Sequence, residues 1–127
     1  MVRAIKTNTD AFIRAGELAG RPIDLVYLAR QTLGDPGLET EILTLFSEMA
    51  AAYFHRAAQS GDSGEIAIGL HALKGAAAGV GAGAIATEAA AAEAELREAG
   101  AVSAERMSDL GIAVEETRAF ISGLLAK

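Results

Sequence analysis

Apolar residues recur at steps of three and four along most of the chain, which is the spacing of one face of a helix. In the segment that begins at Asp35-Pro36, this stripe contains Leu38, Ile42, Leu45, Phe46, Met49 and Tyr53. No window shows the alternation of apolar and polar positions, or the β-branched enrichment, that is typical of strands. The pattern therefore predicts an all-α chain.

Start and stop signals divide the pattern into six predicted helices. Asp35-Pro36 places a capping side chain before a proline at the first helical turn, and Asp62 with Glu65 has the spacing of a capping box. Gly100 is a suitable stop, and Ser103 can cap the last helix. The predicted helices cover about 9–18, 22–34, 36 to about 60, 62 to a break at glycines 79, 81 and 83, 84–99, and a last one after 103.

The two longest stripes in the second half of the chain predict which helix faces are buried. The fourth predicted helix has Ile66, Leu70, Leu73, Ala77 and Val80 on its inward face, and the last has Met107, Leu110, Val114, Thr117, Ile121 and Leu124. Long amphipathic helices joined by short loops favour antiparallel neighbours. We expect a single domain over residues 1–127, with an antiparallel up-down four-helix bundle at 35–127 and two short helices at 1–34 as a lid.

The outward face of the fourth predicted helix carries the only reactive cluster that stands out. At about 100° per residue, a helix that buries Leu70 and Leu73 points its other side to solvent. His71, Lys74 and Gly75 then share one face, about one turn apart. A mid-helix glycine costs on the order of 1 kcal/mol relative to alanine, which indicates that something approaches Gly75 closely. Small and apolar neighbours complete a candidate docking surface for a protein: Ala67, Ile68 and Ala78.

Other interpretations of this segment stay open or fail on context. A helix of alanine and glycine also suits tight packing against a neighbour, with a purely structural histidine. Gly79-Val80-Gly81-Ala82-Gly83-Ala84 matches a dinucleotide-binding fingerprint, but no strand precedes it. Gly75, Gly79 and Gly83 match a small-xxx-small pattern, which is a weak indication of close packing outside a lipid setting.

Composition narrows the function classes. The formal net charge is −6 and the chain has no cysteine, which argues against nucleic-acid binding and excludes thiolate chemistry. Two histidines, at 55 and 71, are too few and too far apart for a zinc site, and no paired carboxylates or nucleophile elbow indicate a self-contained enzyme. Charged residues interrupt the N-terminal apolar positions, and the alanine-rich run is too weakly hydrophobic for a membrane span. We therefore expect a cytoplasmic protein.

The run His71-Ala72-Leu73-Lys74-Gly75, followed by Ala76-Ala77 and Gly81-Ala82, resembles the H-x-L-K-G-[SA]-[SA] signature of histidine-containing phosphotransfer (HPt) domains. Flanking segments extend the resemblance to about residues 20–100: Pro22-Ile23-Asp24-Leu25, Leu33-Gly34-Asp35, Leu43-Thr44-Leu45-Phe46, and Glu93 with Arg97.

This resemblance implies a phosphorelay intermediate in which His71 accepts a phosphoryl group from a receiver-domain aspartate and passes it to another receiver. Lys74 would stabilise the phosphoryl oxygens, Gly75 would give the receiver room, and Glu93 would orient the histidine ring. Arg97 would either pair with Glu93 or lean toward the phosphoryl group.

The expected partners are response-regulator receiver domains and a hybrid histidine kinase. The magnesium ion belongs to the receiver, so no cofactor is expected on this chain. A single active histidine and the lack of a leftover heptad seam favour a monomer. As a phosphocarrier, the chain is expected to have no catalytic turnover of its own.

The sequence departs from the family pattern at three positions. Gly79 stands where a polar residue is common, and Ala89 and Ala92 replace larger residues near Glu93. These departures keep an alternative open, in which the chain is a non-catalytic helical module that docks partners through the same face.

Overall fold

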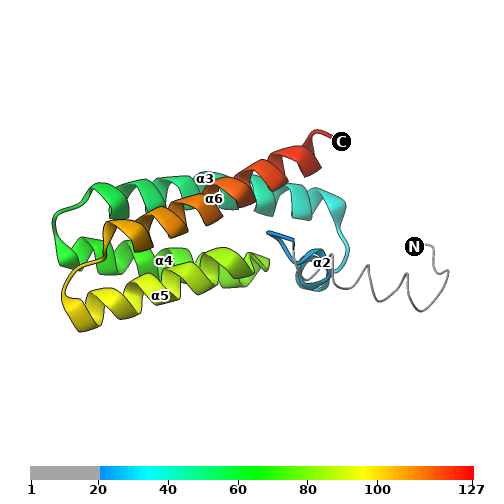
Figure 1. Ribbon diagram of the computed structural model, residues 1–127. Coiled ribbons are helices and arrows are strands. Elements are labelled where there is room, and N and C mark those ends of the chain that lie inside the picture. The colour runs from blue at the N-terminus through cyan, green and yellow to red at the C-terminus, as the bar shows by residue number, and fades with distance from the viewer. Residues whose placement is uncertain (1–20) are drawn as a thin grey trace, which may run out of the picture.

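The computed structural model describes residues 21–127 and contains, in this range, helices only. The helices are α2 (Leu25–Thr32), α3 (Pro36–Gln59), α4 (Ser63–Val80), α5 (Gly83–Ala99) and α6 (Ala104–Leu125). The all-α prediction is confirmed for this part of the chain. The helix expected at 9–18 lies outside the described residues. Figure 1 shows the four longer helices side by side and α2 at one end of them.

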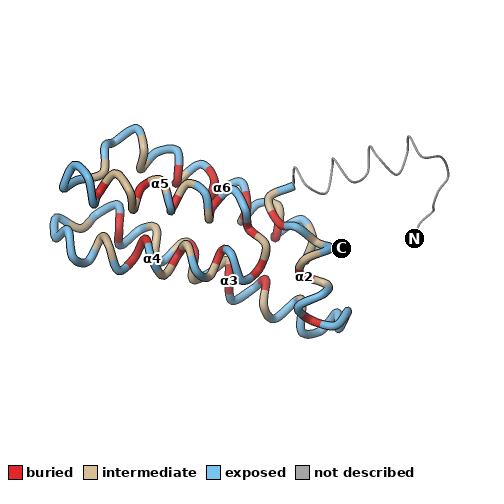
Figure 2. The backbone as a smooth tube through the Cα atoms, turned by 90° about the horizontal axis from the view of Figure 1, so that it is seen from below, coloured by how far each residue is buried: buried red, intermediate tan, exposed pale blue. Residues whose placement is uncertain are grey.

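Each of the four longer helices packs against two of the other three. α3 and α5 both contact α4 and α6, while α2 contacts α3 and α4. Large buried side chains from all five helices meet in one core, together with Ile23, which precedes α2: Leu28, Leu43, Phe46, Leu70, Leu73, Ile85, Leu110, Val114 and Ile121. Figure 2 shows buried positions recurring between exposed ones along each helix, as amphipathic helices require.

The predicted capping residues start the helices. The Asp35 carboxylate accepts from the backbone N–H groups of Gly37 and Leu38, and Ser103 accepts from that of Arg106. Asp62 accepts from Gly64 N at 2.8 Å. The capping box is wrong in one detail, because Asp62 N donates to the Ser60 hydroxyl and not to Glu65. Ser60 is the closer acceptor, since it lies only two residues away.

The second predicted helix begins later than expected. The helix starts at Leu25, because the Asp24 carboxylate accepts from Tyr27 N at 3.0 Å and forms the N-cap. Pro22 is therefore outside the helix, and Ile23 is fully buried. The Asp24 backbone N–H donates to Gly81 O at 2.9 Å, which joins the start of α2 to the α4–α5 loop.

Of the three glycines predicted to break the helix, only Gly81 lies between α4 and α5. Gly81 has φ of 81° and ends α4, whereas Gly79 is inside α4 and Gly83 begins α5. A Cβ atom at Gly81 would lie 3.1 Å from the Tyr27 ring and 3.2 Å from Asp24 O. Both the left-handed backbone and this close approach favour glycine here.

The predicted buried stripes are confirmed on α4 and α6 and partly wrong on α3. Leu70, Leu73, Ala77 and Val80 are buried on α4, with Ile66 half-buried; Leu110, Val114, Thr117 and Ile121 are buried on α6, with Met107 and Leu124 half-buried. On α3, Phe46 is buried as expected, but Leu45 is 58% exposed and Leu43 takes the inward position. Adjacent residues point about 100° apart, so only one of Leu45 and Phe46 can face the core squarely.

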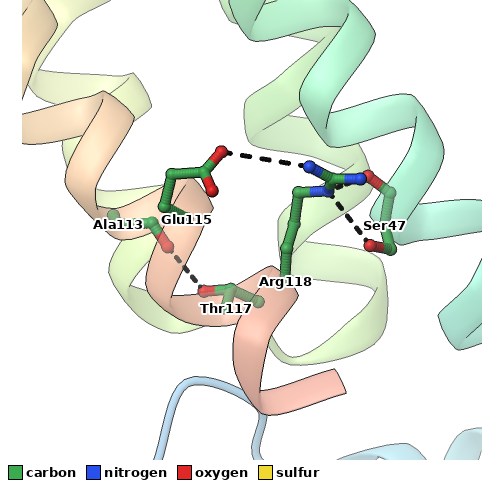
Figure 3. A network of polar contacts seen from close by, with 5 residues as sticks. All are labelled: Ser47, Ala113, Glu115, Thr117 and Arg118. Carbon is green, nitrogen blue, oxygen red and sulfur yellow. Dashed lines mark hydrogen bonds and ion pairs between the residues drawn. The ribbon is translucent and has the colours of Figure 1, made fainter. Parts of the chain in front are cut away.

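Polar contacts also join α3 to α6 (Figure 3). Arg118 Nε donates to the Ser47 carbonyl at 3.0 Å and lies 3.2 Å from its hydroxyl, while Arg118 Nη1 is 3.9 Å from Glu115 Oε2. About two turns earlier on α6, Gly111 allows the helices to approach, because a Cβ atom there would lie 2.8 Å from Phe54 Cζ. One arginine and one glycine thus add a polar contact and a close approach to the apolar packing between α3 and α6.

Candidate functional site

His71 projects from α4 between two anchors. Leu70 and Leu73 are fully buried, so the turn that carries His71 is held against the core while the imidazole stays 74% exposed. Its Nδ1 atom lies 2.9 Å from Glu93 Oε2 on α5. The structure therefore brings together two predicted site residues that are 22 positions apart in the sequence.

Glu93 also holds Lys74. The Lys74 Nζ atom lies 2.6 Å from Glu93 Oε1, so each carboxylate oxygen has its own partner. The hydrogen bond from Lys74 lowers the pKa of Glu93, the hydrogen bond from His71 lowers it further, and burial opposes both. Glu93 is thus an ionised acceptor at neutral pH.

This arrangement determines the state of the histidine ring. An ionised carboxylate only accepts hydrogen bonds, so the nitrogen that faces it, Nδ1, is the one that carries the proton in the neutral ring. The lone pair then resides on Nε2, the outer nitrogen of the exposed ring. In that neutral form, Nε2 is a nucleophile that faces solvent, with a cation one turn away.

The surface around His71 is made of small residues and is open to solvent. A Cβ atom added at Gly75 or Gly79 would meet no other atom within 4 Å. Close packing within the described chain therefore does not explain these glycines. Ala78 is exposed and Ile68 is 72% exposed, as expected for a docking face. Ala67 is only half-exposed and packs against the core, because it lies on the flank of α4 that approaches a neighbouring helix.

Arg97 lies one turn beyond Glu93 on α5 and is exposed. Within residues 21–127 it forms no ion pair. The expected alternative of a Glu93–Arg97 pair is not formed in this structure, where Lys74 and His71 occupy the two carboxylate oxygens. The other alternative, a contact with a phosphoryl group, stays a prediction.

The sequence reasoning missed two features of the site. It assigned Lys74 to the phosphoryl group and did not foresee the Lys74–Glu93 ion pair, because the distance between residues on different helices depends on their packing. It also missed a hollow of about 60 Å³ on the α3 side of α4, lined by Tyr53, Arg56, Glu65, Ile68 and Gly69. The exposed Ile68 was the available signal for this hollow.

The described residues contain no cluster of three or more His, Asp or Glu side chains suited to hold a metal ion. His55, the second histidine, lies exposed on α3. No helix among those at 21–127 has the length and apolarity needed to cross a membrane.

Comparison with known proteins identifies the family. A family model described as "Hpt domain" matches residues 38–123, which runs from the first turns of α3 almost to the end of α6. Comparisons with curated proteins and with solved structures gave no significant match. The family match covers well over half of the chain and includes the helices that carry His71, Lys74 and Glu93. The chain therefore belongs to the family of histidine-containing phosphotransfer domains, which carry phosphoryl groups on histidine in phosphorelays and interact with response-regulator receiver domains.

Proposed function

We propose that this chain is a phosphorelay intermediate that accepts a phosphoryl group on His71 from one receiver domain and passes it to another. The observation that carries the proposal is the contact of His71 Nδ1 with Glu93 Oε2 at 2.9 Å. It leaves Nε2 as the nucleophile on a ring that is 74% exposed. A buried histidine, or one with its lone pair turned inward, would not support this function.

In the proposed transfer, the Nε2 lone pair attacks the phosphorus of a receiver's phosphoaspartate. An N–P bond forms, the bond from phosphorus to the aspartate oxygen breaks, and the carboxylate leaves with the electron pair. The ring gains positive charge, which the nearby Glu93 carboxylate stabilises. Return of the group to a second receiver follows the same steps in reverse.

Lys74 assists as a cation. Its ammonium group lies on the same outward face as His71 and is 37% exposed, so a change of rotamer carries it from Glu93 toward a phosphoryl group on Nε2. Lysine commonly binds phosphate oxygens as a point charge. Arg97 is a second cation for that purpose, and the magnesium ion is supplied by the receiver.

The docking face is centred on Gly75. A receiver must bring its aspartate to within bonding distance of Nε2, and the absence of a side chain at Gly75 leaves that approach clear. Ile68 and Ala78 add exposed apolar surface on either side of His71, and Ala67 borders it. Partial exposure limits Ala67 to the edge of this face.

The architecture belongs to the same proposal. We infer that α3–α6 form an antiparallel up-down bundle that holds the site rigid, and that residues 1–34 act as a lid at one end. Burial of Ile23 and the Asp24–Gly81 hydrogen bond support a closing role for the segment before α2. A single domain, a monomer, action in the cytoplasm and a hybrid histidine kinase upstream are predictions from the sequence.

The test is transfer of labelled phosphate from a phosphorylated receiver in the presence of Mg²⁺. We expect acid-labile, alkali-stable label on the wild-type chain and none on His71→Gln. The second histidine offers a matched control, since His55→Gln should be labelled like wild type. An unlabelled wild-type chain, or full labelling of His71→Gln, contradicts the proposal. Receiver binding without label would instead favour the non-catalytic docking module.

A further inference from the structure

A row of apolar residues lies partly exposed along one flank of α3. The periodicity predicts that the row faces the core, yet Leu38 is 42% exposed and Leu45 is 58% exposed. Between and beyond them, Ile42 and Met49 are only half-buried. The bundle therefore leaves part of the apolar surface of its longest helix without a partner.

This row has the spacing of a seam between two helices. Its members are separated by four, three and four residues, and the next positions at the same spacing, Ala52 and Arg56, are exposed as well. Alternating steps of three and four mark the positions that pack against a second helix of the same spacing. The monomer expected from the sequence assumed that no such seam was left over. We propose that the chain pairs reversibly with a second copy of itself through this α3 seam, with the two α3 helices antiparallel.

The charges along α3 suit an antiparallel pair of identical helices. Arg56 lies exposed at one end of the seam and forms no ion pair within residues 21–127. Glu41 lies exposed at the other end, one turn after Leu38. An axis that sets Leu45 opposite Met49 of the second copy brings each Arg56 to the Leu38–Glu41 turn of the other copy. Opposite charges then meet at both ends, and the two helix dipoles are also antiparallel.

The length of the α3 seam indicates how strong the pairing is. From Leu38 to Arg56 a helix rises about 27 Å, at about 1.5 Å per residue. A single helix pair of this length falls at the low end of specific interfaces, below about 1,200 Å² in total, which is typical of transient complexes. Glu48 is exposed near the middle of the seam, where it approaches its own copy and weakens the pair by like-charge repulsion. We therefore expect dissociation in dilute solution and pairing in concentrated solution.

The α3 seam and His71 lie toward different neighbours of α4. His71 leans toward α5, where its Nδ1 atom contacts Glu93. On the α3 side, Arg56 lines the hollow beside Ile68, together with Glu65. Pairing through α3 leaves the imidazole exposed and involves no phosphoryl group, so the inference stands apart from the proposed function.

The experiment is sedimentation equilibrium of the full chain from about 10 µM to 1 mM. The mean mass should rise from 13.0 kDa toward twice that value. Leu45→Lys should weaken pairing at least about tenfold, because it places a charge in the seam. The matched control is Ile112→Lys, which replaces a similarly exposed residue, 54% exposed, on α6 and should pair like wild type. Circular dichroism should show the same helix content for both variants.

A charge exchange tests the antiparallel arrangement. Glu41→Arg and Arg56→Glu should each pair more weakly than wild type when alone, because like charges then meet at both ends. An equimolar mixture of the two variants should recover the pairing, and Glu48→Gln should strengthen it. A chain that is monomeric throughout, equal weakening by Leu45→Lys and Ile112→Lys, or a mixture no stronger than its components would overturn the inference. A monomeric chain in which Leu45→Lys weakens receiver binding would assign the seam to the receiver and overturn it too. None of these results would affect the proposed function, which labelling of His71 tests separately.

Discussion

The outward faces of α4 and α6 are both exposed to solvent but differ in the size and charge of their side chains. The face of α4 around His71 has glycine, alanine, one isoleucine and Lys74 and, beyond the first turn, no acidic residue. The face of α6 carries exposed Glu105, Asp109 and Glu116 around an exposed Ile112. Because α4 and α6 each pack between α3 and α5, these three acidic residues of α6 lie away from the histidine. The comparison teaches that the α4 face is distinguished by its small side chains, which leave open space around His71.

The largest expected effect comes from filling that clear space. Gly75→Leu should slow transfer from a receiver about 100-fold. A bulky side chain at this position keeps the receiver's phosphoaspartate from the distance and angle that attack by His71 Nε2 requires. Chemical loading of His71 by phosphoramidate should be nearly unchanged. Gly123→Leu is the matched control on α6, where a Cβ atom likewise meets nothing within 4 Å. Equal slowing by both variants would contradict a special role for the α4 face.

On α6, Gly111 serves the packing of the bundle, whereas Gly75 leaves space for a partner. Gly111→Ala should lower the free energy of unfolding by about 1–3 kcal/mol, because overpacking forces side chains and backbone to shift. The new Cβ atom would lie 2.8 Å from Phe54 Cζ. Denaturant unfolding measures the change. Gly75→Ala on α4 should instead raise stability, so a loss of stability in both variants would show that Gly75 also serves packing.

Removing the cation on the α4 face should have a smaller effect on transfer. Lys74→Ala should slow phosphoryl transfer at least about tenfold, because a hydrogen bond to a charged group contributes about 1.5–3 kcal/mol. Stopped-flow or radiolabel kinetics with one receiver would measure it. Lys74→Arg should recover part of the rate. A rate unchanged in Lys74→Ala would mean that Lys74 serves only to hold Glu93.

The same ion pair should make stability depend on pH. The pKa of Glu93 is lowered in the folded state, mainly by Lys74, so its contribution is fully present above the ordinary pKa of glutamate. The contribution is lost as pH falls through the lowered folded-state pKa. The free energy of unfolding of wild type minus that of Glu93→Gln should therefore decrease on acidification below about pH 4.3. A difference that stays constant down to about pH 3 would contradict the ionised pair.

The smallest effect is expected on α6. The triple variant Glu105→Gln, Asp109→Asn and Glu116→Gln should change the transfer rate by no more than about twofold at physiological salt, because exposed charges beyond about 8 Å are screened. Transfer assays at two salt concentrations would check this. A large change would mean that α6 contacts the receiver.

The features that depend only on residues within a single helix were predicted well. The caps at Asp35, Asp62 and Ser103 and the stop at Gly100 depend on residues within one turn of each other, and all four are confirmed. The inward anchors Leu70 and Leu73 are confirmed for the same reason, since helical phase fixes them relative to His71. The exposed histidine follows directly from those anchors.

The features that depend on two elements could not be predicted equally well. Periodicity admitted both Leu45 and Phe46 as inward residues, and only the position of α3 against its neighbours places Leu45 outside. The hydrogen bond that ties the start of α2 to the α4–α5 loop joins Asp24 to Gly81, 57 positions away in the sequence. The sequence resemblance suggested that Glu93 would reach His71, but helix packing made it the shared partner of His71 and Lys74.

The hydrogen bond from Asp24 N to Gly81 O has a consequence for how the molecule opens. Gly81 lies in the loop that joins α4, which carries His71, to α5, which carries Glu93. The Asp24 amide therefore reports whether α2 is attached to this loop. Its proton can exchange with solvent only when α2 separates from the loop. We expect the exchange rate of this single amide, followed in deuterated buffer, to report how often α2 detaches from the α4–α5 loop.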